Sequence, residues 1–186
     1  MVAGPGEPRQ EEGGTALEPG PLLTALDATG EAIDARARVI AWALGEVGEQ
    51  DPRKYFGMCA PQYLADGRDH SRDTSWCGIF VLSALRAAGV VGPDWTWATG
   101  LGFVNREDPA GKRWMPCTAL PQAPGDVVVF GAPTWHHAIV HSWGNGRVYT
   151  VDGNTLPAPR EGVATRSRPL AAYGYYSLAR LLGEAP

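Results

Sequence analysis

The apolar residues of this chain change their spacing once, and that change constrains the fold more than any other feature. Up to about residue 90 they recur at intervals of three and four, the period of an amphipathic helix. From about residue 126 onward the interval is two, the period of a half-buried strand. Helices followed by strands predict an α+β domain, in which N-terminal helices pack on one C-terminal antiparallel sheet.

Two helices are predicted in the first half. The first spans about residues 31–48, and its apolar face is expected at Ile33, Ala37, Ile40, Leu44 and Val47. The second spans residues 76–88, where Ser75 or Thr74 can cap the N-terminus. Gly89 follows it at the position where helices often end in a left-handed residue. Residues 53–74 lack a clear period, so we expect a loop there with a short turn near residues 60–64.

Strands are predicted at residues 127–130, 138–142, 147–151, 163–168 and 175–182. The run Gly144-Asn145-Gly146 has the composition of a hairpin turn. Residues 90–123 contain several Gly, Pro and Trp, and we expect mostly loop with one short helix. Residues 1–29 are rich in Pro, Gly and Glu, which is typical of a flexible leader or linker. The domain is therefore expected at residues 30–183.

Charge and composition exclude several classes of function. The net charge of −4 gives no attraction to nucleic acid or anionic lipid, and no long apolar run predicts membrane insertion. The N-terminus lacks the regions of a signal peptide, so we expect synthesis in the cytoplasm and export or release by dedicated machinery. Three cysteines (Cys59, Cys77, Cys117) fit no zinc pattern, although one disulfide between Cys59 and Cys117 is possible. We expect neither a metal nor an organic cofactor.

Cys77 is the cysteine best placed to act as a nucleophile. It lies at the start of the second predicted helix, where unpaired backbone N–H groups and the helix dipole favour the thiolate. The same N–H groups can bind the oxyanion that forms when a thiolate attacks a carbonyl. Cys59 and Cys117 lack such a helix start, and we expect them to be ordinary apolar residues.

A histidine on the second predicted strand can supply the base, because its pKa lies near neutrality. Strand alternation puts His136 on the same face as Ala138 and puts His137 on the opposite face. Only one face can meet the helix that carries Cys77. The small Ala138 leaves room for a helix to approach, which favours His136, but periodicity alone leaves His137 as an alternative.

Asp152 and Asn154 follow the next strand, at the end that the hairpin brings back beside His136. Either side chain could orient the imidazole and stabilise its cation. Their spacing of two puts both on one side if the chain stays extended through Gly153. An Asp-Gly-Asn run is also typical of a simple turn.

In this order and setting, the residues resemble the CHAP family (cysteine, histidine-dependent amidohydrolases/peptidases) of the papain-like superfamily, which includes NlpC-type cell-wall peptidases. The matching elements are Trp-Cys-x-x-Phe-Val at 76–81, Pro-Gly-Asp-Val-Val-Val-Phe at 124–130, His-x-Ala-Ile-Val at 136–140 and Asp-Gly-Asn-Thr at 152–155. The resemblance spans about residues 32–182 and implies a papain-like fold. It also implies that His136 is catalytic, that Asn154 orients it, and that Asp152 stands where Glu is frequent. Gly78 departs from the Ala usual in the family.

The resemblance implies a cysteine amidase or endopeptidase that cleaves amide bonds of bacterial peptidoglycan through a thioester on Cys77. Such an enzyme would be a lysin or a secreted antibacterial effector, with an immunity protein or secretion machinery as possible partners. Trp76, Trp97 and Trp135 are candidates for a groove that stacks on sugar or peptide. Two alternatives are a cysteine hydrolase, deamidase or acyltransferase toxin acting on a cytosolic protein, and a non-catalytic binding module.

Overall fold

A computed structural model describes residues 30–67, 74–98, 102–105, 117–130, 136–155, 161–170, 174–179 and 181–182. Its helices are α1 (Gly30–Gly45), α2 (Arg53–Cys59), the 3-10 helix η1 (Pro61–Gly67) and α3 (Cys77–Ala87). Its strands are β1 (Trp95–Ala98), β2 (Gly102–Asn105), β3 (Cys117–Thr118), β4 (Val127–Phe130), β5 (His136–Gly144), β6 (Arg147–Asp152), β7 (Ala164–Pro169) and β8 (Gly174–Tyr176). The predicted leader at 1–29 lies outside the described residues.

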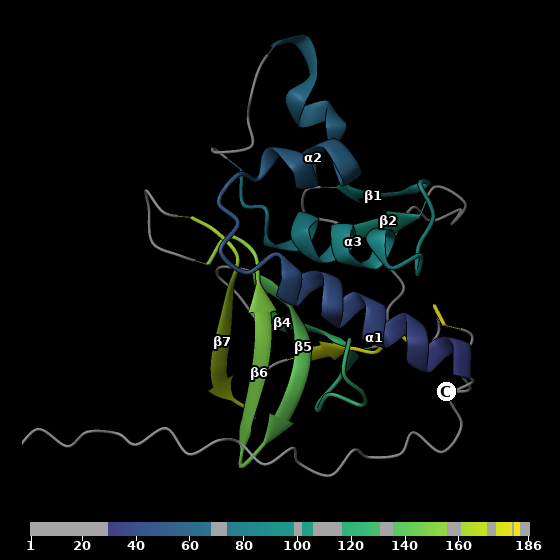
Figure 1. The fold of residues 1–186 in the computed structure, drawn as a ribbon, viewed down its shortest axis with the longest axis vertical. Helices are drawn as coiled ribbons and strands as arrows, with labels where there is room; N and C mark the ends of the chain where they lie inside the picture. Colours follow the sequence, from purple (N-terminus) through teal and green to yellow (C-terminus); the bar gives the residue numbers. More distant parts are fainter. Residues whose placement is uncertain are drawn as a thin grey trace, which may run out of the picture.

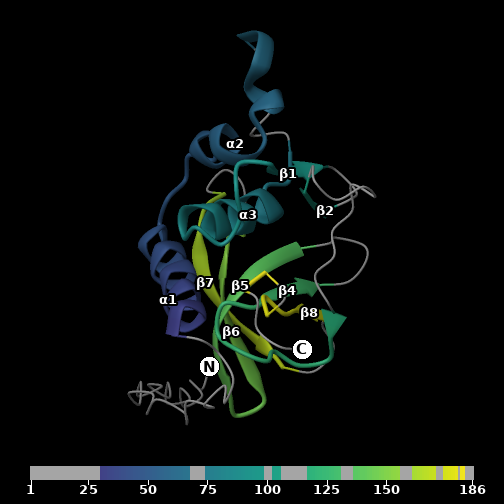
Figure 2. The same ribbon diagram turned by 90° about the vertical axis from the view of Figure 1, so that its right-hand side faces the viewer.

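The α+β prediction is confirmed. Within the described residues, six strands form one antiparallel sheet in the order β3-β8-β4-β5-β6-β7, and β1 and β2 form a separate hairpin. The helices α1 and α3 pack against β5, and two views show the helices gathered beside the sheet (Figures 1 and 2). None of the helices in these ranges combines the length and the apolar composition that a bilayer crossing requires.

Local sequence signals predicted several elements well. The helix predicted at 76–88 is α3, and Gly89 beyond it has the left-handed φ of +73°. The strand predicted at 127–130 is β4. Asn145 and Gly146 join β5 to β6 with φ of 52° and 71°, the two positive values of a type I′ hairpin turn.

Other segments were predicted wrongly. Helix α2 and the hairpin β1–β2 lie where we expected loops, with no short helix in the described part of 90–123. Both are short, and tertiary packing rather than local period defines them: Tyr55 and Phe56 of α2 and Trp95 of β1 are all buried. The last strand, β8, has three residues and is far shorter than predicted.

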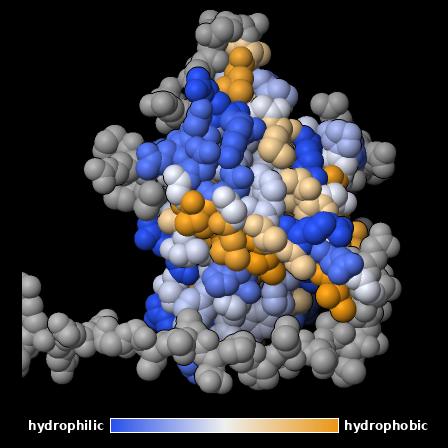
Figure 3. Space-filling model, in the orientation of Figure 1, coloured by the Kyte–Doolittle hydropathy of each residue, from blue (hydrophilic) through white to orange (hydrophobic). Residues whose placement is uncertain are grey.

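The orientation of α1 was also predicted wrongly. The predicted inner face points outward: Ile33, Leu44 and Val47 are 54%, 41% and 45% exposed. The inner face consists of Ala35, Arg36, Val39 and Ala43. The small residues of this face let α1 approach the sheet closely. Arg36 can be buried because its guanidinium pairs with a carboxylate beneath the helix. In Figure 3 the outward apolar residues follow the course of α1 as an orange stripe.

Asp126 is the carboxylate beneath α1, and it joins three separate segments. Its fully buried side chain accepts hydrogen bonds from Arg36 Nη1 at 2.9 Å and from Leu178 N at 3.2 Å. Two further bonds come from Gln122 N at 2.8 Å and Ala123 N at 3.1 Å, within the turn before β4. Asp126 therefore fastens α1 and the chain after β8 to the start of β4.

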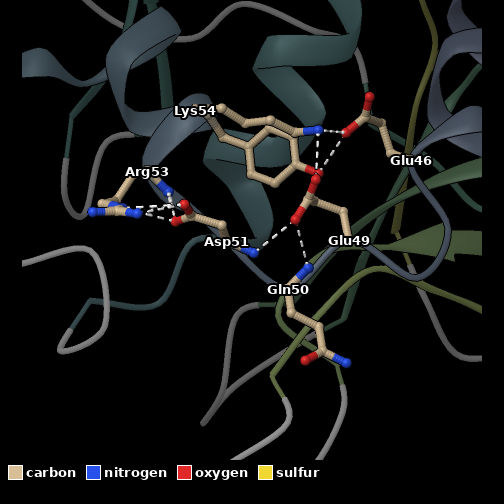
Figure 4. Close-up of polar contacts among 7 residues, drawn as sticks. Glu46, Glu49, Gln50, Asp51, Arg53 and Lys54 are labelled. Carbon is tan, nitrogen blue, oxygen red and sulfur yellow. Dashed lines mark hydrogen bonds and ion pairs between the residues drawn. The ribbon is translucent and has the colours of Figure 1, made fainter.

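Polar contacts hold the connection between α1 and α2 (Figure 4). Glu49 Oε1 accepts from the backbone N–H of Gln50 and of Asp51, at 2.8 and 2.9 Å. Tyr55 donates its hydroxyl to Glu46 at 2.7 Å, and Lys54 forms ion pairs with Glu46 and Glu49. These contacts fix the Tyr55 ring, which stacks on Trp76 with centroids 5.4 Å apart. The cluster thereby supports the residue that precedes Cys77.

Candidate active site

Cys77 is the first residue of α3 and is 3% exposed. The cap position is occupied by Trp76, whose side chain makes no capping bond, so the predicted cap by Ser75 or Thr74 is wrong. Ser75 Oγ instead lies 3.7 Å from Cys77 Sγ. The helix start therefore carries its thiol at the positive end of the dipole without a side-chain cap.

Two neighbouring histidines act on the Cys77 thiol. Burial alone would raise its pKa, but hydrogen bonds from the side chains of His136 and His137 lower it. The charge of His136 and a hydrogen bond from the His137 backbone lower it further, and the resulting pKa is about 5. At neutral pH Cys77 is therefore a thiolate, the nucleophilic form.

His136 holds the complementary positive charge. Burial lowers its pKa, but the hydrogen bonds to Asp152 and Cys77, together with their charges, raise it to about 9. The thiolate of Cys77 and the imidazolium of His136 therefore coexist between about pH 5 and pH 9. Such a pair titrates as a unit.

The two histidines occupy opposite faces of β5, as alternation requires. His137 shares its face with Ile139, which belongs to the core under the helices, and its ring meets Trp97 edge-on at 5.2 Å. His136 shares the opposite face with Ala138, in a second cluster that includes Phe130. Ala138 therefore lies on the face away from α3 and does not make room for it, contrary to the prediction. His136 reaches Cys77 from the first residue of β5.

Asp152, not Asn154, lies against His136. Asp152 Oδ2 is 2.8 Å from His136 Nε2, whereas Asn154 Nδ2 donates to Ser75 Oγ at 3.4 Å. The expectation that both side chains share one side fails because Asn154 has a left-handed φ of 56°. The chain turns at this point with Gly153 pressed on the core, where a Cβ would lie 2.6 Å from Phe80.

Arg168 and Thr150 also hold the buried carboxylate of Asp152. Arg168 Nη2 donates to Oδ2 at 2.5 Å and Nη1 to Oδ1 at 3.3 Å, while Thr150 donates to Oδ1 at 2.5 Å. Burial raises the pKa of Asp152, but His136, Arg168 and Thr150 together hold it below the usual value. Asp152 is therefore ionised and fixed where it can stabilise the imidazolium.

Arg168 was missed by the sequence reasoning. Its guanidinium carbon lies 4.4 Å from the centre of the Phe130 ring, and that ring stacks on His136 at 5.5 Å. The available signal was the spacing of Arg166 and Arg168, which are two residues apart in a predicted strand and therefore lie on one face. Only the pairing of β6 with β7 shows that this face also carries Asp152.

Of the three tryptophans predicted to form a groove, the structure contradicts one, Trp76. Trp76 is fully buried and stacked on Tyr55, which contradicts its predicted role in substrate binding. Trp97 lies over the start of α3, where a Cβ on Gly78 would be 2.2 Å from its ring. This contact explains why Gly78 replaces the expected Ala. Trp135 lies outside the described residues.

An open pocket of about 500 Å³ reaches His136. It is lined by Ser75, Phe130, His136, Asn154, Thr155 and Arg168. Asn154 therefore faces the pocket although it does not contact His136. In the ranges that the structure covers, no three His, Cys, Asp or Glu side chains are grouped to hold a metal ion.

Alkylation measures the state of each thiol. The rate at which iodoacetamide modifies Cys77 is expected to rise with pH through a midpoint near 5, because the thiolate is the reacting form. Cys59 is reduced and buried, and burial raises its pKa, so it should stay unmodified over the same range. Mass spectrometry of the modified peptides separates the two sites. A midpoint for Cys77 at or above about 8.5 would contradict the ion pair.

Cys59 has a free thiol in the described structure, so the disulfide with Cys117 that the sequence left open is not formed there. Comparison of the chain with protein-family models, with curated proteins and with solved structures gives no match. A functional assignment therefore rests on the residues and the geometry of the site.

Proposed function

We propose that this protein is a cysteine hydrolase of amide bonds, with a papain-like fold of the CHAP type, and that it cleaves bacterial peptidoglycan. The observation that carries the proposal is the charged chain of contacts from Cys77 through His136 to Asp152, with the thiol at a helix N-terminus. A buried structural cysteine would have a raised pKa, as Cys59 has. The opposite shift at Cys77 is typical of a nucleophile.

The first step is attack of the Cys77 thiolate on the amide carbonyl, which forms the C–S bond. The backbone N–H of Cys77 helps to bind the oxyanion. Because Nε2 of His136 is bonded to Asp152, Nδ1 is the ring nitrogen that faces the reaction. The C–N bond then breaks, and the leaving amine takes the Nδ1 proton.

The second step is hydrolysis of the resulting thioester. The neutral His136 takes a proton from water, and the hydroxide attacks the thioester carbonyl. The C–S bond breaks, and the thiolate and imidazolium are restored together with a carboxylic acid product, which releases its proton to water. Throughout the cycle, Asp152 keeps the imidazole ring in one orientation and stabilises its cation, with Arg168 and Thr150 fixing the carboxylate.

The choice of peptidoglycan is supported by the motifs at residues 76–81, 124–130, 136–140 and 152–155, which resemble CHAP domains. It is also supported by the open pocket, which gives a peptide access to His136. A lysin or a secreted antibacterial effector fits this activity.

The proposal is tested by digesting purified sacculi with the full chain and identifying released fragments by mass spectrometry. We expect the wild type to release peptide-bearing fragments and the Cys77→Ala variant to release none. If the wild type releases no more than the variant, peptidoglycan is not the substrate. Alkylation of Cys77 then shows whether the enzyme or only the choice of substrate was wrong. If the Cys77 thiolate forms near pH 5, Cys77 is still a nucleophile, and protein substrates should be tested instead.

A further inference from the structure

We propose that Arg166 and Thr155 form a subsite at the rim of the pocket that binds a carboxylate of the substrate. The inference rests on the proposed function and narrows it to amide bonds that lie next to an acidic or carboxyl-terminal residue. Three features carry it: the groups that line the pocket, the unbalanced charge of Arg166, and the fixed position of Thr155.

The pocket is lined by cations and hydrogen-bond donors. Its charged lining side chains are His136 and Arg168, and its other polar ones are Ser75, Asn154 and Thr155. No carboxylate belongs to the described lining. A pocket of this kind, in a chain with a net charge of −4, favours an anionic group of a ligand over a cationic one.

Arg166 holds a charge that its contacts do not neutralise. It precedes Arg168 by two residues on β7, so both side chains lie on one face. Arg166 Nε donates to Thr155 Oγ1 at 3.1 Å and Nη2 donates to the Thr155 carbonyl at 2.8 Å. Both partners are uncharged oxygens. Among the described residues its Nη1 has no acceptor, in contrast to Arg168, whose two Nη atoms are taken by Asp152 and Thr150.

A count of charges places the surplus on Arg166. The anions of the site are the thiolate of Cys77 and the carboxylate of Asp152, and both are in contact with His136. The cations are His136, Arg168 and Arg166. Three cations against two anions leave one positive charge, and Arg166 is the cation that contacts neither anion.

Thr155 links this charge to the pocket. Its hydroxyl oxygen accepts from Arg166, so its own proton is free to be donated, and the residue lines the pocket. A carboxylate that accepted from the Thr155 hydroxyl and from Arg166 Nη1 would receive one neutral and one charge-assisted hydrogen bond. Arginine suits this task because its planar donors match a carboxylate.

Two peptide probes test the subsite without knowledge of the natural substrate. They are bromoacetyl-alanyl-glutamate amide and bromoacetyl-alanyl-glutamine amide, which differ only in one charge. In both, the Cys77 thiolate forms a C–S bond to the bromoacetyl carbon as bromide leaves. We expect the wild type to be alkylated about 10- to 100-fold faster, per molar probe, by the glutamate peptide, as one charge-assisted hydrogen bond implies.

Three variants test whether Arg166 causes the preference for the glutamate probe. Arg166→Gln should lose the preference for the glutamate probe, and alkylation of its Cys77 by iodoacetamide, which carries no carboxylate, shows that the variant is folded. Arg166→Lys, which keeps the positive charge, should retain part of the preference for the glutamate probe. Arg147→Gln is the matched control, because Arg147 donates to the hydroxyl and carbonyl of Ser167 in the same way, at the other end of β6. This variant should keep the full preference.

Equal rates for the two probes with the wild type, or a preference that survives in Arg166→Gln, would overturn the subsite and leave the nucleophile intact. Failure of Cys77 to react with either probe would overturn the proposed function as well.

Discussion

Replacing Asp152 with asparagine is expected to lower kcat/KM by about 10³–10⁴-fold, a loss of the size seen when a triad carboxylate becomes an amide. The amide cannot balance the charge of the His136 imidazolium. It would also leave Arg168 facing a neutral group, since Arg168 bonds both oxygens of the carboxylate. The measurement is the initial rate of fragment release from sacculi at equal concentrations of folded protein.

The same variant should narrow the pH range of the ion pair. The hydrogen bond to Asp152 is the largest of the effects that raise the pKa of His136, so its loss lowers that pKa from about 9. A less charged His136 in turn stabilises the thiolate less, so the pKa of Cys77 rises from about 5. Alkylation as a function of pH should therefore show a midpoint shifted upward.

Asn154→Ala is the control, since Asn154 lines the pocket but contacts Ser75 rather than His136. Its effect should be less than about 10-fold, the size of one neutral hydrogen bond, without a change in the alkylation midpoint. If Asn154→Ala shifted that midpoint as far as Asp152→Asn, then Asn154 would be the residue that orients His136, as the family resemblance implied.

Replacing Asp126 with alanine is expected to lower the free energy of unfolding by about 3–5 kcal/mol, because it breaks a buried ion pair and leaves its cation behind. Arg36 and Asp126 have side chains 8% and 0% exposed. The variant also removes the acceptor for three backbone N–H groups, those of Gln122, Ala123 and Leu178. Urea unfolding monitored by tryptophan fluorescence measures the change.

Asp51→Ala provides the comparison. Asp51 also pairs with an arginine, Arg53, but these side chains are 46% and 60% exposed, and such surface pairs contribute about 0–1 kcal/mol. A similar fall in stability for the two variants would show that Asp126 does not fasten α1 to the sheet.

The part of the fold that follows from local period was predictable. Helix α3 and strand β4 are marked by apolar runs, that of β4 being unbroken and buried throughout. The residues Asn145-Gly146 have the composition that a tight hairpin turn requires. The facing of α1 was not predictable, because its outward side carries larger apolar residues than its inward side. Burial of Arg36 depends on Asp126, which is 90 positions away in the sequence.

The candidate site also combines residues that local sequence could identify with residues that depend on tertiary structure. Cys77 could be found from a helix start, whereas the choice of His136 over His137 came from the family resemblance and not from strand alternation. The choice between Asp152 and Asn154 depended on a left-handed residue within two positions of a strand, which the run Asp-Gly-Asn does not reveal. Arg168 could not be assigned without the register of β6 and β7, since only that pairing brings it to Asp152.

The packing of Trp97 on Gly78 has a consequence for how this site can vary among related sequences. Alanine is normally better than glycine inside a helix by about 1 kcal/mol, so drift at position 78 should favour it. Here the added methyl group would lie 2.2 Å from the indole ring. Positions 78 and 97 must therefore change together: a sequence that carries alanine at the first should carry a smaller side chain at the second.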